Sequence, residues 1–104
     1  MPRIEVAPMP MYISHLRWTQ LGAHKIKESP ARLDAAKKIF EMDCVKMLHF
    51  FMTTGTYDMV AICEAPNDEA MAKVTLKLIS GGGVTTQTSR AFTEAEYRGI
   101  IGGL

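Results

Sequence analysis

The chain has 104 residues, of which 47% are hydrophobic and 22% charged, and its 12 basic and 11 acidic residues leave a formal net charge of +1. These values predict one globular domain with a core of its own, and they exclude an intrinsically disordered chain. Because no block of like charge occurs and no apolar run approaches the roughly 20 residues that cross a bilayer, we expect neither nucleic acid nor a membrane as a partner.

Cysteine usage and the first residues bear on where the protein resides. The chain has two cysteines, Cys44 and Cys63, and both lie in apolar, strand-like stretches. Such a pair is typical of free, buried thiols rather than of a disulfide framework. The first residues also lack the apolar stretch of a signal peptide, so we expect a cytoplasmic protein.

The chain is interpreted as an N-terminal arm, residues 1–10, followed by one domain, residues 11–104. Three prolines and the lack of any periodic pattern characterise the arm. The domain begins with Met11–Trp18, whose β-branched and aromatic residues predict a strand. A break at 19–22 and a short helical turn at 23–27 are expected to follow.

Three helices are predicted from their N-terminal signals. A serine, threonine or asparagine can accept a hydrogen bond from an unpaired amide at a helix start, and proline is tolerated at the first helical position. The starts are Ser29 with Pro30, Asn67, and a capping box formed by Thr93 and Glu96. The helices are expected to end near Met42, at the glycines 81–83 and at Ile101.

Three further strands, 44–54, 57–65 and 84–92, complete the pattern, and Gly55 with Thr56 is predicted to form a tight turn between the first two. The element order is then βαββαβ with a terminal helix. Right-handed crossovers place both main helices on one face of a four-stranded antiparallel sheet with the strand order 4-1-3-2. We therefore predict an α+β fold of the ferredoxin-like type.

The third predicted strand is apolar on both of its faces. Met59, Ala61 and Cys63 point to one side, and Val60 and Ile62 point to the other. The helices can cover only one face, and the other would expose an apolar patch of the size that marks an interaction site. We therefore expect a second copy to pack sheet to sheet, which makes a homodimer with a dimeric α/β barrel, or a dimer of such dimers.

Several short motifs occur in a fixed order along the chain. They are Tyr12-Ile13, Trp18-Thr19, Ser29-Pro30-x-Arg32, Gly55-Thr56-Tyr57-Asp58, Glu64-Ala65-Pro66-Asn67-Asp68-Glu69-Ala70 and Arg90-Ala91-Phe92-Thr93. With these motifs the chain resembles the GYD-domain family of small bacterial proteins, over about residues 12–101. The resemblance implies a ferredoxin-like domain of the dimeric α/β barrel superfamily. It implies no particular activity, because the family is generally described as having no established function.

His15 and His49 are candidate general bases, because an imidazole pKa of about 6.5 suits proton transfer near neutral pH. The predicted register places His49 opposite Ile62, and one strand separates it from His15. Each histidine is alternatively a packing residue of its strand. The histidines show no metal-ligand spacing, and the glycine run follows a helix rather than a strand, so we expect no metal and no cofactor.

Tyr57 and Asp58 directly follow the predicted turn. One interpretation places a phenol and a carboxylate at the mouth of the barrel, where they orient a polar ligand. In the other, Asp58 bonds to the turn backbone and Tyr57 packs. A two-residue turn puts Tyr57 on the same face as Met59 and Ala61.

Trp18 and Arg90 lie at strand ends within the matched motifs. Either can bind an aromatic or anionic ligand. Alternatively, Trp18 caps the core, and Arg90 pairs with Glu94 or Glu96. The candidate ligand site therefore consists of His15, Trp18, His49, Tyr57, Asp58 and Arg90. In this reasoning either face of the sheet can line the barrel.

Three functions fit these residues. The first is binding of a small, largely apolar ligand in the barrel between the two sheets. The second is a cofactor-free oxygenase or isomerase that acts on an aromatic or lactone-like substrate, by analogy with other dimeric α/β barrels at the level of fold. The third is a structural or interaction module whose barrel is filled by side chains.

Overall fold

The computed structural model describes residues 9–104. The elements in chain order are β1 (Met11–Trp18), α1 (Gln20–His24), the short 3₁₀ helix η1 (Ile26–Glu28), α2 (Ser29–Met42), β2 (Lys46–Met52), β3 (Met59–Glu64), α3 (Asp68–Ser80), β4 (Val84–Ala91) and α4 (Glu94–Gly102). The predicted N-terminal arm lies outside the described residues except for Met9 and Pro10. The carbonyl of Pro10 accepts a hydrogen bond from the Ala65 amide at 3.0 Å, so the chain joins the sheet at this point.

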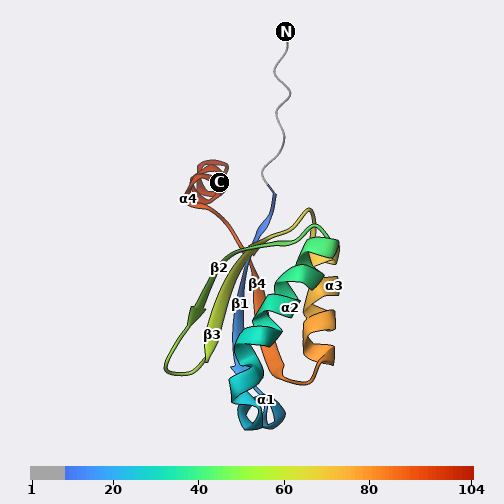
Figure 1. Ribbon diagram of the computed structural model, residues 1–104. Helices are drawn as coiled ribbons and strands as arrows, with labels where there is room; N and C mark the ends of the chain where they lie inside the picture. Colours follow the sequence, from blue (N-terminus) through green and yellow to red (C-terminus); the bar gives the residue numbers. More distant parts are fainter. Residues whose placement is uncertain (1–8) are drawn as a thin grey trace.

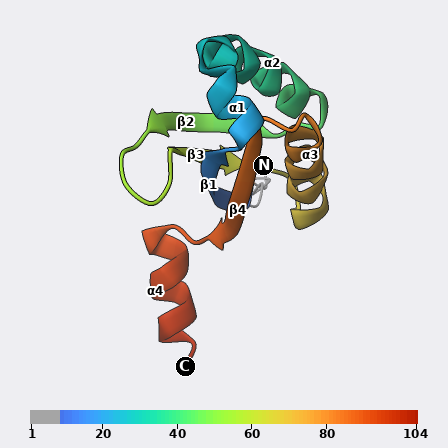
Figure 2. The same ribbon diagram turned by 90° about the horizontal axis from the view of Figure 1, so that it is seen from below.

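The four strands form one antiparallel sheet in the order β2-β3-β1-β4. This order confirms the predicted ferredoxin-like topology. Helices α2 and α3 lie side by side on one face of the sheet (Figure 1). Seen along the strands, α4 projects from the end of β4 on the opposite side (Figure 2). None of the helices within residues 9–104 combines the length and the apolar character of a membrane span.

The core lies between the sheet and the two long helices. Tyr12, Ser14 and Leu16 of β1 are buried, and the residues between them are partly exposed, as the two-residue period of a strand requires. Phe40 of α2 and Val74 of α3 belong to the same apolar cluster. The even-numbered residues of β1 therefore face the helices, and the odd-numbered ones face away.

The start of α2 differs from the prediction at one residue. Glu28 occupies the N-cap position without a side-chain hydrogen bond, and Ser29 already has helical dihedral angles. The 3₁₀ turn of η1 runs directly into α2, so Ser29 never takes the extended conformation that a capping serine needs. Its hydroxyl oxygen instead accepts a hydrogen bond from Nε1 of Trp18 at 3.3 Å.

The register of the β2-β3 hairpin is confirmed, with His49 opposite Ile62. The hairpin itself differs from the prediction in two ways. A bulge between Met47 and His49 moves Met47 to the helix-covered face. The strands also end earlier, at Met52 and Met59, and leave a longer loop than two residues.

This longer loop corrects the predicted position of Tyr57. The two-residue turn placed Tyr57 on the same face as Met59 and Ala61, but those two residues are buried beneath the helices. Tyr57 precedes β3, and the loop turns its ring to the other face, next to His15. The strand period that the prediction extended to Tyr57 therefore ends at Met59.

The two cysteines are free but not alike. Cys63 is fully buried in β3, and burial raises the pKa of its thiol to about 11. Cys44 is exposed, so the prediction of two buried thiols is wrong for this residue. It lies between α2 and β2 with a φ of 60°, and its amide donates to the Glu41 carbonyl at 3.0 Å, which completes the turn out of the helix.

Candidate functional site

The face of the sheet that α2 and α3 leave uncovered is called the open face here. Its side chains are Ile13, His15 and Arg17 of β1, His49 and Phe51 of β2, Val60 and Ile62 of β3, and Thr85, Gln87 and Ser89 of β4. Its centre is apolar, and Phe51 on the edge strand is 53% exposed. Both faces of β3 are therefore apolar, as predicted, but the helices bury only one of them.

Four polar side chains meet at one end of the open face, and they form the Tyr57 cluster: His15, Arg17, Tyr57 and Gln87. The ring centroids of His15 and Tyr57 are 4.8 Å apart, with an angle of 44° between the planes. The guanidinium carbon of Arg17 lies 5.0 Å from the centroid of the Tyr57 ring. The Tyr57 hydroxyl donates a hydrogen bond to Oε1 of Gln87. These contacts hold the phenol between β1 and β4.

The Tyr57 cluster borders a shallow cavity of about 300 Å³, which Thr85 and Thr86 also line. A guanidinium and an amide donate hydrogen bonds, and an imidazole and a phenol can donate or accept them. A positive charge among these groups favours a carboxylate or another small anionic group, because charge-assisted hydrogen bonds are the stronger ones. The arrangement can therefore hold the polar end of a ligand whose remainder lies on the apolar centre of the face.

Two of these four residues were missed by the sequence analysis. Arg17 follows His15 by two positions and so lies on the same face of β1. Gln87 is the cross-strand partner of His15 in the β1-β4 pair. Arg17 could be found from the strand period alone. Gln87 could not, because its position depends on the register between two strands that are distant in the sequence.

His49 lies on the other side of the open face. Its ring stacks near that of Phe51, with the centroids 6.2 Å apart. Strand β3 separates it from His15, as predicted, so the structure does not bring the two histidines into one site.

Asp58 and Trp18 join the end of β1 to the start of β3. Oδ2 of Asp58 accepts a hydrogen bond from the Trp18 amide at 3.0 Å, and the Asp58 amide donates to the Leu16 carbonyl at 2.9 Å. The Trp18 ring packs against the core cluster. The carboxylate is therefore engaged with strand backbone, and neither residue belongs to the Tyr57 cluster.

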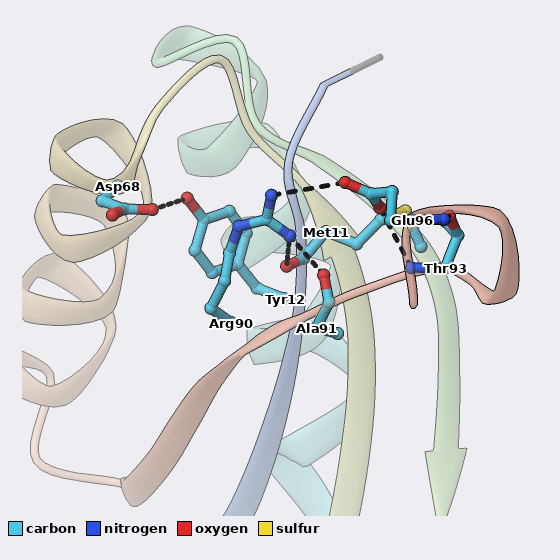
Figure 3. A network of polar contacts seen from close by, with 7 residues as sticks. All are labelled: Met11, Tyr12, Asp68, Arg90, Ala91, Thr93 and Glu96. Atoms are coloured by element: carbon cyan, nitrogen blue, oxygen red, sulfur yellow. Dashed lines mark hydrogen bonds and ion pairs between the residues drawn. The ribbon is translucent and has the colours of Figure 1, made fainter. Parts of the chain in front are cut away.

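Arg90 connects three elements at the opposite end of the sheet (Figure 3). Its Nη1 donates to the carbonyls of Met11 and Ala91, the former at 3.4 Å. Its Nη2 lies 3.6 Å from a carboxylate oxygen of Glu96, one of the two predicted ion-pair partners in α4. The guanidinium also lies over the ring of Phe92, 4.5 Å from its centroid. In this chain Arg90 therefore holds the start of α4 against the end of the sheet.

The predicted capping box of α4 is present beside this contact. Thr93 Oγ1 accepts a hydrogen bond from the Glu96 amide at 3.1 Å, and the Glu96 carboxylate accepts one from the Thr93 amide at 3.0 Å. The hydrogen bond from the Thr93 backbone, with the nearby Arg90, lowers the pKa of Glu96. The capping box and the ion pair between Arg90 and Glu96 together therefore hold the first turn of α4 in place.

Within residues 9–104 no three His, Cys, Asp or Glu side chains are grouped closely enough to hold a metal ion. The site therefore rests on the Tyr57 cluster and the apolar centre of the open face. The motif Gly55-Thr56-Tyr57-Asp58 gives both the phenol of this cluster and the carboxylate that fixes the strand behind it. The family model described as the GYD domain matches residues 12–101.

The chain belongs to the GYD-domain family. A similar relative of this GYD domain is the glutamine synthetase and cystathionine beta-lyase binding protein of Thermus thermophilus. The two sequences are 30% identical over 89 residues, which cover 85% of this chain and 94% of the relative.

Two solved structures from Mycobacterium tuberculosis share the fold of this GYD domain. The leucine response regulatory protein superposes with a TM-score of 0.61 at 11% identity, over 81% of this chain and 51% of that chain. The feast or famine regulatory protein, complexed with L-methionine, gives a TM-score of 0.64 at 12% identity, over 89% of this chain and 58% of that chain. The GYD domain thus spans little more than half the length of these regulators, and at such identities the likeness shows the fold alone.

Proposed function

We propose that this GYD domain is a cytoplasmic binding protein that works as a homodimer and holds a small, largely apolar ligand between its two sheets. The observation that carries the proposal is the open face, with its apolar centre and the Tyr57 cluster at one end. A single copy leaves Phe51 of this face 53% exposed. An apolar sheet face of this kind is typical of an interaction surface.

A second copy is the partner that fits this face best. The C-terminal helix α4 stands on the same side of the sheet (Figure 2), and its apolar residues Tyr97, Ile100 and Ile101 are 57%, 51% and 51% exposed. A two-fold axis would let α4 of each copy pack against the other while the open faces meet. The net charge of +1 gives little repulsion between two copies.

The ligand class follows from the two parts of the open face. Sheets that pack face to face lie about 10 Å apart, and a barrel between them is bounded by the residues of both open faces. Ile13, Val60 and Ile62 favour an apolar body. The Tyr57 cluster favours a polar or anionic end, which Arg17 can pair with and Tyr57 can hydrogen-bond.

The dimer can be tested with a charge placed on the open face. Phe51→Glu should convert the dimer into a folded monomer, because Phe51 is already half exposed in a single copy and a buried pair of carboxylates would oppose association. Met42→Glu is the matched control, since Met42 is 78% exposed at the end of α2 on the helix side. Sedimentation velocity should give a monomer for Phe51→Glu and the wild-type assembly for Met42→Glu. Equal assembly of the two variants would contradict the proposal.

Binding of a partner enzyme is a second candidate function. It is favoured by the relative from Thermus thermophilus, which matches most of this chain and is named for binding two enzymes. We expect co-elution of this GYD domain with glutamine synthetase or cystathionine beta-lyase in size-exclusion chromatography if the function is shared. Independent elution of both enzymes would leave the small-ligand function alone. A cofactor-free enzyme stays a prediction for the same cluster: His15→Ala should then abolish turnover without loss of the fold.

A further inference from the structure

A second, larger cavity lies on the helix-covered side of the sheet. It is called the interlayer cavity here, because the sheet forms its floor and helices α2 and α3 its roof. Its volume is about 550 Å³. Sites for small molecules commonly have volumes of roughly 300–1,000 Å³. The proposed barrel does not include this cavity, which lies on the other face of the sheet.

The cavity exists because small side chains occupy the middle of both layers. Ser14 and Ala61 are direct cross-strand partners in the two central strands, and α2 contributes Ala36. Larger apolar residues surround these positions: Leu16, Phe40, Phe50, Met59, Met71 and Leu78. A core filled to the usual density would carry larger side chains in the centre of such a layer.

The interior of the cavity is apolar. Its buried hydroxyl, that of Ser14, is already hydrogen-bonded to Oγ1 of Thr88 at 2.8 Å. Within residues 9–104 no buried side-chain nitrogen or oxygen lacks a hydrogen-bond partner. The interior therefore offers mainly dispersion contacts and burial of apolar surface, and the hydroxyl of Ser14 within it is already paired.

One end of the cavity is polar, and the charged side chain of Arg32 lies there. Gly22, Ser29 and Gly83 line this end together with Trp18. The Arg32 guanidinium lies so close to the Gly83 backbone that a Cβ at Gly83 would come within 2.5 Å of Nη1. The Arg32 side chain is 39% exposed, so it lies at the mouth rather than in the interior.

The charges at this mouth leave Arg32 able to bind an anion. Nη2 of Arg32 pairs with Glu28 at 3.3 Å, but the Glu28 side chain is 60% exposed, and a guanidinium carries five N–H groups in all. Lys77, another cation that borders the cavity, is bound to Asp43 at 2.7 Å. Arg32 can therefore donate hydrogen bonds to a ligand carboxylate in addition to its contact with Glu28.

We propose that the interlayer cavity binds an amphiphilic monocarboxylate, whose apolar chain lies between the sheet and the helices and whose carboxylate pairs with Arg32. The cavity volume accommodates the chain, the bonded hydroxyl of Ser14 keeps the interior apolar, and the guanidinium marks the end at which the charge lies. This site is independent of the barrel between two copies.

Trp18 reports directly on this site, because it lines the cavity and is the one tryptophan of the chain. We would titrate the wild-type protein with decanoate and follow the Trp18 emission, with decanol and decyltrimethylammonium as probes of equal chain length. Decanoate should change the emission to saturation and bind at least about tenfold more tightly than decanol, since the ion pair is made only by the carboxylate. No saturable response of Trp18 to decanoate would overturn the proposal.

Two variants locate the response. Arg32→Gln should remove the preference for decanoate over decanol, and Lys37→Gln, on an exposed position of the same helix, should retain it. A preference that survives Arg32→Gln would overturn the assignment of the carboxylate. Phe51→Glu on the open face should leave the decanoate response unchanged, which separates this site from the proposed barrel.

A cavity-filling variant tests the space itself. Ala36→Leu keeps a good helix former in α2 and places its side chain in the cavity. It should abolish the decanoate response and leave the melting temperature unchanged or raised, because the added atoms enter empty volume. A lowered melting temperature would show that the layer is already packed, and an unchanged decanoate response would place the probe elsewhere. Either result overturns the proposal.

Discussion

Two charged residues of the predicted ligand site, Asp58 and Arg90, make structural contacts instead. The Asp58 carboxylate accepts a hydrogen bond from the Trp18 amide. The Arg90 guanidinium joins β4 to the start of β1 and to α4. Charged groups suit these positions because hydrogen bonds to an ionised partner are stronger than neutral ones. The sequence shows the residue type, but the backbone groups that a carboxylate or guanidinium meets depend on how strand ends are placed in space.

Removal of the Asp58 carboxylate should destabilise the fold. Asp58→Ala leaves the partly buried Trp18 amide without its acceptor, and we expect a loss of about 1–3 kcal/mol in the free energy of unfolding. Asp58→Asn keeps an acceptor oxygen and should lose less. Urea denaturation of the three proteins measures this order, and an Asp58→Ala protein as stable as the wild type would show that the contact does not hold β1 to β3.

The Tyr12 hydroxyl gives the fold a dependence on pH in the alkaline range. Burial, with the hydrogen bond from this hydroxyl to Asp68, raises the pKa of Tyr12 from 10.0 to about 12. The folded state therefore holds this proton more tightly than the unfolded state, and the corresponding stability is complete below pH 10 and is lost as the pH rises to about 12. The slope should be reduced in Tyr12→Phe, measured by urea denaturation at several pH values. Parallel pH profiles of the two proteins would contradict this assignment.

At the scale of elements, a glycine corner sets the position of α1 against the start of β4. A Cβ at Gly22 would lie 2.0 Å from the Gly83 carbonyl oxygen, a distance that no side chain can occupy. The Thr19 hydroxyl reinforces the corner, because it donates to the Gly82 carbonyl at 2.6 Å. Gly22 and Gly83 of this corner also line the Arg32 end of the interlayer cavity.

Two glycine substitutions should have opposite effects. Gly22→Ala forces the corner apart and should cost about 1–3 kcal/mol or more, as overpacking does. Gly99→Ala, where the added methyl meets open space in α4, should be neutral or stabilise by up to about 1 kcal/mol. Thermal unfolding of the two variants compares them directly, and a Gly22→Ala protein that melts with the wild type would show that the corner is not tightly packed.

Much of the element pattern could be predicted from the sequence, because the signals are local. The capping box of α4, the asparagine cap of α3 and the bounds of β1 agree with the residues that predicted them. The bulge in β2 and the long loop before β3 could not be predicted, because no local residue type requires them. The bulge moves Met47 to the helix-covered face, and the loop turns Tyr57, the central residue of the candidate site, to the face opposite the predicted one.

At the scale of the whole molecule, the sheet separates two cavities of different character. The open face is apolar in its centre, with the Tyr57 cluster at one end, and in the proposed dimer a second copy covers it. The interlayer cavity is complete within one copy. The apolar pattern of β3 on both faces predicted that both sides of the sheet need cover. It could not predict that small residues under the helices leave a cavity on the covered side.

The homodimer is the central claim, and native mass spectrometry of the wild-type protein, purified without added ligand, tests it most directly. The account predicts an assembly of two 11.5 kDa chains, or a dimer of such dimers, and any retained compound should add a reproducible mass. Tyr57→Phe should then reduce the fraction of the assembly that carries this compound, without dissociating the assembly. A single 11.5 kDa chain in solution would contradict the account, because the open face would then remain exposed to water.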